Sequence, residues 1–133
     1  MAARRVTHLY DSALASCELK LTQFSILAEL AHRGTSPPTM GELAQAMVMD
    51  RSTLGHNLRP LERDRLIELT ASEEDRRSRR VRLTPAGFAK FEEASALWRT
   101  AQTRFESGFG VKRAENLRKV LRQVAALDFT TSA

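Results

Sequence analysis

A run of arginines is the feature of this sequence whose chemistry is specific enough to start from. The stretch EEDRRSRRVRLTPAG, residues 73–87, has two acids, then five arginines within seven positions, then a short alternating run that ends at Thr-Pro. Guanidinium groups on a hairpin can enter the narrow minor groove of duplex DNA, where the potential is most negative. A solvated charged loop is the simpler interpretation of the same residues. The arginines considered for the minor-groove role are Arg76, Arg77, Arg79 and Arg80.

A second group of polar side chains belongs to the helix predicted for residues 51–64. Leu54, Leu58 and Leu61 stand at i, i+4 and i+7, so they face inward and leave a polar face outward. Serine and threonine can hydrogen-bond base edges or phosphates, and arginine can bind guanine through two hydrogen bonds. We expect this face to contact the major groove, the alternative being an ordinary solvated helix face. The expected contact residues are Arg51, Ser52, Thr53, His56 and Arg59.

Residues that could support catalysis or metal binding are scattered. His8, His32 and His56 lack metal-binding spacing, and no other ligand stands near Cys17 in the sequence. No nucleophile motif, phosphate-binding glycine loop or catalytic carboxylate pair is present. We therefore expect neither an enzyme nor a bound cofactor or metal. A thiol-dependent enzyme acting through Cys17 is an alternative for which the sequence offers no base.

The DNA-facing residues need a helix-turn-helix and a hairpin to position them. Thr39 and Glu42 form a capping box before a short helix, and Asp50 caps the next helix after the tight turn VMD. Helices joined by so short a turn cross one another, as in a helix-turn-helix. The runs RLIEL and RRVRLT predict a hairpin with a long loop, after which Thr84 and Pro85 begin a new helix.

Further helices are expected on both sides of this unit, which makes the fold mainly α. Pro60 predicts a kink or an irregular last turn in its helix. Apolar stripes on the terminal helices have too little core of their own to cover them, so a partner subunit is expected and the chain is inferred to be a homodimer. The helices are predicted over 6–17, from Thr22 to Gly34, from Thr84 to about 107, where SGFG breaks the pattern, and over 112–127. The organisation predicted is one domain over 1–133, with a winged helix-turn-helix at 21–85 between dimerisation helices at 1–20 and 86–133.

Charge and composition favour a nucleic-acid partner. The net charge is +5 and the isoelectric point is about 10.1, which favours an anionic partner. No run of about 18 apolar residues predicts a membrane span, and the N-terminal segment lacks the apolar stretch of a secretory signal. One cysteine excludes an intramolecular disulfide framework. We expect a soluble cytoplasmic protein.

The hairpin sequence resembles a known family signature. DRRSRRVRLTPAG, Asp75 to Gly87, is similar to the wing of the MarR family of bacterial transcriptional regulators, D-R-R-x-x-x-V-x-L-T-x-x-G, and has every fixed position. LTQFSILAEL at 21–30 and GELAQAMVMDRSTLGHNLRPLERDRLI at 41–67 resemble that family's second helix and helix-turn-helix. The resemblance implies a dimeric winged helix that binds a pseudo-palindromic operator, usually as a repressor, often released by a small ligand or by oxidation.

The resemblance also implies roles for residues of the wing. The D-R-R arginines would enter the minor groove, Arg77 first, and Asp75 would pair with a nearby arginine because phosphate repels it. The sequence has Glu73 and Glu74 where many members have Asp-Pro.

Effector binding and oxidant sensing are further properties of the family. Family effectors often bind between the dimerising and DNA-binding parts, where Tyr10 and Trp98 could line a pocket, although aromatic residues at helical spacing are more often core. Some members sense oxidants through an N-terminal cysteine. Cys17 falls on an apolar stripe beside Glu18, so a buried inert thiol is the favoured interpretation.

The function predicted is therefore a sequence-specific double-stranded-DNA-binding regulator, acting as a dimeric repressor. The alternative is a winged helix used as a protein-interaction module without sequence-specific DNA binding.

Overall fold

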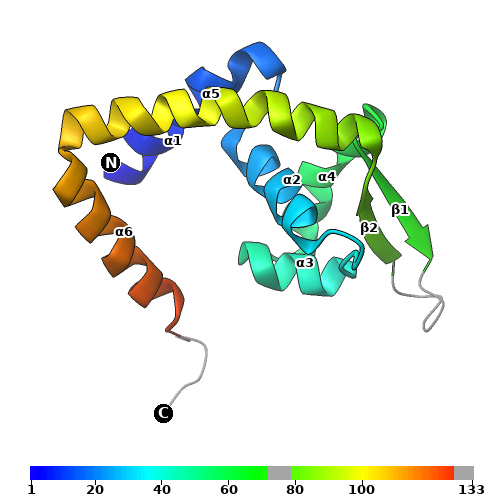
Figure 1. Ribbon diagram of the computed structural model, residues 1–133. Helices are drawn as coiled ribbons and strands as arrows, with labels where there is room; N and C mark the ends of the chain where they lie inside the picture. Colours follow the sequence, from blue (N-terminus) through cyan, green and yellow to red (C-terminus); the bar gives the residue numbers. More distant parts are fainter. Residues whose placement is uncertain (72–78, 128–133) are drawn as a thin grey trace. The chain divides into compact units, whose positions relative to one another are not determined.

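The computed structural model describes residues 1–71 and 79–127 (Figure 1). The described residues form one compact unit that spans Met1–Trp98 and a second that begins at Arg99. The fold is mainly helical with one antiparallel hairpin, as the sequence predicts. The elements are α1 (Ala2–Leu14), the 3-10 turn η1 (Ala15–Cys17), α2 (Leu21–Arg33), α3 (Met40–Met47), α4 (Arg51–Arg63), β1 (Ile67–Ala71), β2 (Arg79–Leu83), α5 (Pro85–Phe109) and α6 (Val111–Ala125).

The helix-turn-helix is formed by α3 and α4, which pack on each other. The capping box at its start is confirmed, because Glu42 donates its backbone N–H to Thr39 Oγ1 at 3.1 Å and Thr39 donates its own to Glu42 Oε1 at 3.4 Å. The turn depends on Val48, whose φ of 53° and ψ of 50° are left-handed. A β-branched residue rarely adopts this conformation, so the sequence pattern could predict the turn but not its geometry.

The predicted hairpin is confirmed: β1 pairs with β2 in antiparallel fashion, with Ile67 opposite Leu83 and Leu69 opposite Val81. The segment before α3 also pairs with this hairpin, which the sequence does not predict, through an isolated antiparallel bridge of Thr39 with Arg80. Val81 donates its backbone N–H to the Pro38 carbonyl at 2.9 Å. The segment before α3 therefore pairs with the other edge of β2 and ties the hairpin to the helix-turn-helix.

The core of the first unit lies between α2, α4 and the inner face of the hairpin. In Figure 1, α2 lies alongside α4, and the hairpin stands at one side of the two helices. The inward leucines predicted for α4 are confirmed as buried. The largest fully buried apolar side chains are Leu14, Ile26, Leu27, Leu43, Leu54, Leu61, Ile67 and Val81.

Two predicted helix boundaries differ in detail. Helix α1 begins at Ala2 rather than residue 6, because its first turn is exposed and carries no apolar periodicity to reveal it. Helix α5 continues to Phe109 rather than ending near residue 107, and the predicted break within the SGFG segment falls at its last residue. The actual break comes at Gly110, whose φ is 107°. Helix α4 continues through Pro60 to Arg63, in agreement with the helix predicted over 51–64.

The second unit contains the end of α5 and all of α6. Arg118 Nη1 lies 3.0 Å from Glu106 Oε1, and the Arg113 guanidinium stacks over the Phe109 ring at 4.9 Å. Among the described residues, no helix is long and apolar enough to cross a membrane. The apolar side chains of α6 that remain exposed are Val111, Val120, Leu121 and Val124.

Candidate nucleic-acid interface

Helix α4 begins at a well-formed N-cap. Asp50 Oδ1 accepts the backbone N–H of Thr53 at 2.7 Å. The hydrogen bonds from Thr53 hold the pKa of the Asp50 carboxyl below its ordinary value. Because the cap fixes where the first turn starts, it also fixes which side chains of α4 face outward.

The outward face of α4 contains most of the predicted contact residues. With Leu54, Leu58 and Leu61 buried, the rotation of about 100° per residue places Ser52, His56 and Arg59 opposite the core. These residues and Thr53 are exposed. The sequence therefore identified a real surface, lined by hydroxyl, imidazole and guanidinium groups.

Arg51 is the exception within this group. Its Nη2 lies 3.1 Å from where a Cβ would stand on Gly41, so the side chain extends back over the first turn of α3. Arg51 thus belongs to the contact between the two helices as well as to the exposed surface.

Of the contact residues predicted in the wing, Arg79 is the one that lies within the described residues. It opens β2, pairs with Ala71 across the hairpin and is exposed. Asp75, Arg76 and Arg77 lie outside the described residues.

Arg80 does not belong to the hairpin tip, contrary to the sequence interpretation. Its Nη1 donates to the Pro37 carbonyl at 2.8 Å, and the side chain is half-buried. The reason is the pairing of the segment before α3 with β2, which the arginine spacing could not reveal. Arg80 anchors the hairpin to the helix-turn-helix.

The base of the hairpin is joined to α5 by the Thr-Pro-x-Gly part of the motif. The Thr84 hydroxyl donates a hydrogen bond to the Arg65 carbonyl at 2.7 Å. The same hydroxyl accepts a hydrogen bond from the Gly87 N–H at 2.9 Å. The Thr84 N–H donates to the Leu66 carbonyl at 3.0 Å. A Cβ on Gly87 would stand 2.0 Å from that same carbonyl oxygen. The motif therefore fixes the hairpin against the start of α5.

Tyr10 and Trp98 do lie together, but as packed rings. Their centroids are 6.2 Å apart with planes 25° from parallel, and Phe24 stacks on Trp98 at 6.3 Å. Tyr10 is 8% exposed. This arrangement matches the core interpretation weighed from the sequence, with each ring covering part of its neighbour.

Cys17 is buried, with 2% of its surface exposed. Burial raises the pKa of its thiol, and a hydrogen bond with Glu93 raises that pKa further, while the charge of Lys90 lowers it. The acid that acts on the thiol is thus Glu93 of α5 rather than the sequence neighbour Glu18. Such a thiol stays protonated and is a poor nucleophile near neutral pH. Among the described residues, no three His, Cys, Asp or Glu side chains gather in a group that could hold a metal.

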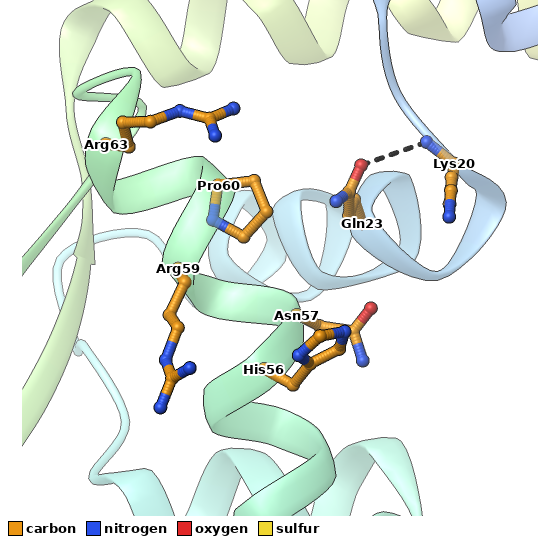
Figure 2. A pocket seen from close by; sticks show the side chains of 7 residues that line it. All are labelled: Lys20, Gln23, His56, Asn57, Arg59, Pro60 and Arg63. Atoms are coloured by element: carbon orange, nitrogen blue, oxygen red, sulfur yellow. Dashed lines mark hydrogen bonds between the residues drawn. The ribbon is translucent and has the colours of Figure 1, made fainter.

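A cavity of about 450 Å³ lies between α4 and the start of α2 (Figure 2). It brings Lys20, together with Arg63 at the end of α4, to the same surface as His56 and Arg59. Arg63 could have been found from the sequence, since it continues the helical spacing of His56 and Arg59. Lys20 could not, because it belongs to another helix.

Comparison with known proteins identifies relatives of this architecture. The MarR family model matches residues 18–78. The transcriptional regulator MosR of M. tuberculosis is 31% identical, over 95% of this chain and 91% of that chain, with a TM-score of 0.76. A structure of MosR in complex with DNA is 34% identical, over 95% of this chain and 93% of that chain, with a TM-score of 0.73.

A second relative has also been solved with DNA. The transcriptional repressor CouR, bound to a 23-mer DNA duplex, is 28% identical, over 93% of this chain and 87% of that chain, with a TM-score of 0.85. No curated protein sequence matches the chain.

Proposed function

Because the chain belongs to the MarR family of transcriptional regulators, we propose that it binds a pseudo-palindromic DNA operator as a homodimer and represses nearby genes. The recognition helix of each subunit would be α4, entering the major groove, and the hairpin would contact the flanking minor groove. A small ligand or an oxidant would release the complex.

The observation that carries this proposal is the composition of the outward face of α4. Ser52, His56 and Arg59 are exposed, and the fold gives none of them a packing role among the described residues. Arg59 forms no ion pair with a described residue. Exposed hydroxyl and guanidinium groups on a helix capped at its N-terminus suit base and phosphate contacts in the major groove.

The relatives support the same interpretation. MosR, 34% identical, has been solved in complex with DNA, and CouR, 28% identical, is a repressor solved with a DNA duplex. DNA binding by the present chain, with repression as its consequence, follows from these likenesses and from the α4 surface together.

The minor-groove contact is proposed for Arg77, with Arg76 beside it and Asp75 holding one of the two by an ion pair. Arg79, exposed at the start of β2, would contact phosphate next to them. Replacement of Arg77 by alanine is expected to weaken binding to every sequence and to flatten its salt dependence. Unchanged affinity and salt slope would rule out the minor-groove role of the wing.

Of the two release signals, a small ligand is the better supported. The raised pKa and burial of Cys17 keep its thiol protonated and shielded, which disfavours oxidation. A ligand would have to separate the stacked rings of Tyr10 and Trp98 if it bound there, so ligand binding would be accompanied by a change in their packing and in Trp98 fluorescence.

The homodimer is proposed from α6. Val120, Leu121 and Val124 are about half exposed, at 52%, 54% and 46%, on a helix that a second subunit could cover. Sedimentation at several concentrations tests this directly, since a monomer at micromolar concentration would contradict it.

The decisive experiment measures fluorescence anisotropy with two duplexes, one from the DNA flanking the protein's own gene and one of equal length with that sequence scrambled. Both titrations are run at low and at physiological salt. Preference for the flanking DNA that survives physiological salt is the expected result. Equal binding that disappears with salt would instead indicate purely electrostatic attraction, and would favour the alternative of a protein-interaction module.

A further inference from the structure

We propose that the cavity between α4 and the start of α2 holds a backbone phosphate of the bound duplex, with Lys20 and Arg63 as its charged ligands. This inference rests on the DNA-binding function proposed above and extends it to the end of α4 and to Lys20, which lies outside the helix-turn-helix and the wing.

The lining of the cavity is the first argument. The described residues that line it are basic or neutral, and none of them is acidic. Lys20 and Gln23 come from the start of α2, and the other lining residues come from α4 (Figure 2). Such a lining favours an anionic group. The lining residues are Lys20, Gln23, His56, Asn57, Arg59, Pro60 and Arg63.

The charges in this cavity are only weakly neutralised within the fold. Lys20 forms no ion pair with a described residue. Arg63 does pair with Asp64, with Nε 3.3 Å from Oδ1, but the two side chains are 74% and 53% exposed. Exposed pairs of this kind contribute roughly 0 to 1 kcal/mol, so the Arg63 guanidinium can leave Asp64 for a phosphate.

The position of the cavity along α4 selects a phosphate rather than a base edge. Ser52, His56, Arg59 and Arg63 follow one another along the outward face. At about 1.5 Å per residue, this row spans roughly 16 Å, whereas the major groove is about 12 Å wide. If the first turn of α4 reads bases, the end with Arg63 must therefore reach the edge of the groove, where the phosphates lie.

The backbone around Lys20 is held in place before any ligand arrives. The Lys20 N–H donates to Gln23 Oε1 at 3.0 Å, and the Leu21 N–H donates to Asp11 Oδ1 at 2.6 Å. Gln23 is 9% exposed. Lys20 also lies at the N-terminus of α2, which is the positive end of the helix dipole. The side chain of Lys20 takes no part in these bonds, so it is available to a ligand.

The test replaces Lys20 by alanine. The helix cap should survive because it uses the backbone N–H, and an unchanged thermal unfolding midpoint checks this. Loss of one phosphate contact should lower the magnitude of the slope of log K against log salt by about 0.9, and should weaken binding about eightfold at 0.1 M salt. The loss should be equal for flanking and scrambled duplexes. Lys20→Gln should lower the salt slope and the affinity as Lys20→Ala does. Lys119→Ala, which removes one positive charge from α6, should leave the salt slope unchanged.

A phosphate scan identifies the contact itself. Single uncharged methylphosphonates are placed in turn along the shortest duplex that retains binding. One position should weaken the wild-type protein but not Lys20→Ala, because that variant has already lost the contact. If no such position exists, or if the salt slope of Lys20→Ala equals that of the wild type, the phosphate site is excluded.

Two other outcomes are distinguishable. If inorganic phosphate, tested against an equal ionic strength of chloride, competes only with the wild type while the salt slope is unaffected by Lys20→Ala, the cavity binds a free anion and the proposal is wrong. If the wild type does not discriminate flanking from scrambled DNA, the proposed function fails. The salt slope of Lys20→Ala on scrambled DNA still decides the phosphate contact in that case, because phosphate contacts do not depend on sequence.

Discussion

Gly87 and Gly55 show how differently the same residue is used at the base of the hairpin and on α4. A Cβ on Gly87 would stand 2.0 Å from the Leu66 carbonyl oxygen and 2.7 Å from Leu83 Cδ1. A Cβ on Gly55 would meet no atom within 4 Å. The fold therefore demands glycine at position 87, while nothing in the described chain demands it at position 55.

The same difference extends to the neighbouring residues. At the hairpin base, Thr84 is buried and its hydroxyl both donates and accepts. On the outward face of α4, His56 and Arg59 are exposed. A motif residue at the base is thus explained by contacts within the protein, whereas the α4 face has no such contacts and is the surface proposed to bind DNA.

Replacement of Gly87 by alanine should have the largest effect on stability. The new methyl group would overlap a backbone carbonyl, which cannot move without separating the hairpin from α5. We expect a loss of about 3 kcal/mol or more in the free energy of unfolding, measured by urea denaturation. If Gly87→Ala is as stable as the wild type, the close approach of α5 to Leu66 is wrong.

Replacement of Thr84 by valine should cost less, because it keeps the side-chain volume and removes only the hydroxyl. The Gly87 N–H and the Arg65 carbonyl would each lose a partner, and an unsatisfied buried group costs about 1 to 3 kcal/mol. Thr84→Ser, which keeps the hydroxyl, is the matched control. Equal destabilisation of both variants would show that the methyl group matters rather than the hydrogen bonds.

Replacement of Arg59 by alanine should leave stability unchanged and act on DNA binding instead. Loss of a base contact is expected to cost about 1 to 3 kcal/mol on the preferred duplex and to relax its preference over scrambled DNA. Anisotropy titrations on both duplexes measure this. A destabilised Arg59→Ala variant would mean that the α4 face has a structural role after all, and the contrast with the hairpin base would disappear.

The sequence predicted the helices and strands better than it predicted the contacts between them. Capping at Thr39 and Asp50, the inward leucines of α4 and the two strands of the hairpin are local patterns, and the structure confirms them. Pairing of Pro38 with Val81 joins residues far apart in the chain, so no local period reveals it. The contact of Arg80 with the Pro37 carbonyl depends on this pairing, so the sequence could not predict it either.

In the candidate site, too, the residues of a single helix could be predicted, whereas a residue brought in from another segment could not. Ser52, His56 and Arg59 follow from the period of a single helix, and the structure places them on one exposed face. Lys20 joins that surface from α2 only after folding, so a pattern read along the chain cannot detect it.

Replacement of Gly55 by alanine should have the smallest effect on stability, and in the opposite direction. Alanine is favoured over glycine inside a helix by about 1 kcal/mol, and the structure leaves room for its methyl group. Urea denaturation should therefore show a more stable protein.

The DNA affinity of the same Gly55→Ala variant then separates the two interpretations of this glycine. If the α4 backbone approaches DNA closely at Gly55, the methyl group will clash and affinity will fall although stability rises. If affinity is unchanged, the glycine is merely tolerated. A fall in affinity for Gly55→Ala that is equal on flanking and scrambled duplexes would point to contact with the DNA backbone, since only that contact is independent of sequence.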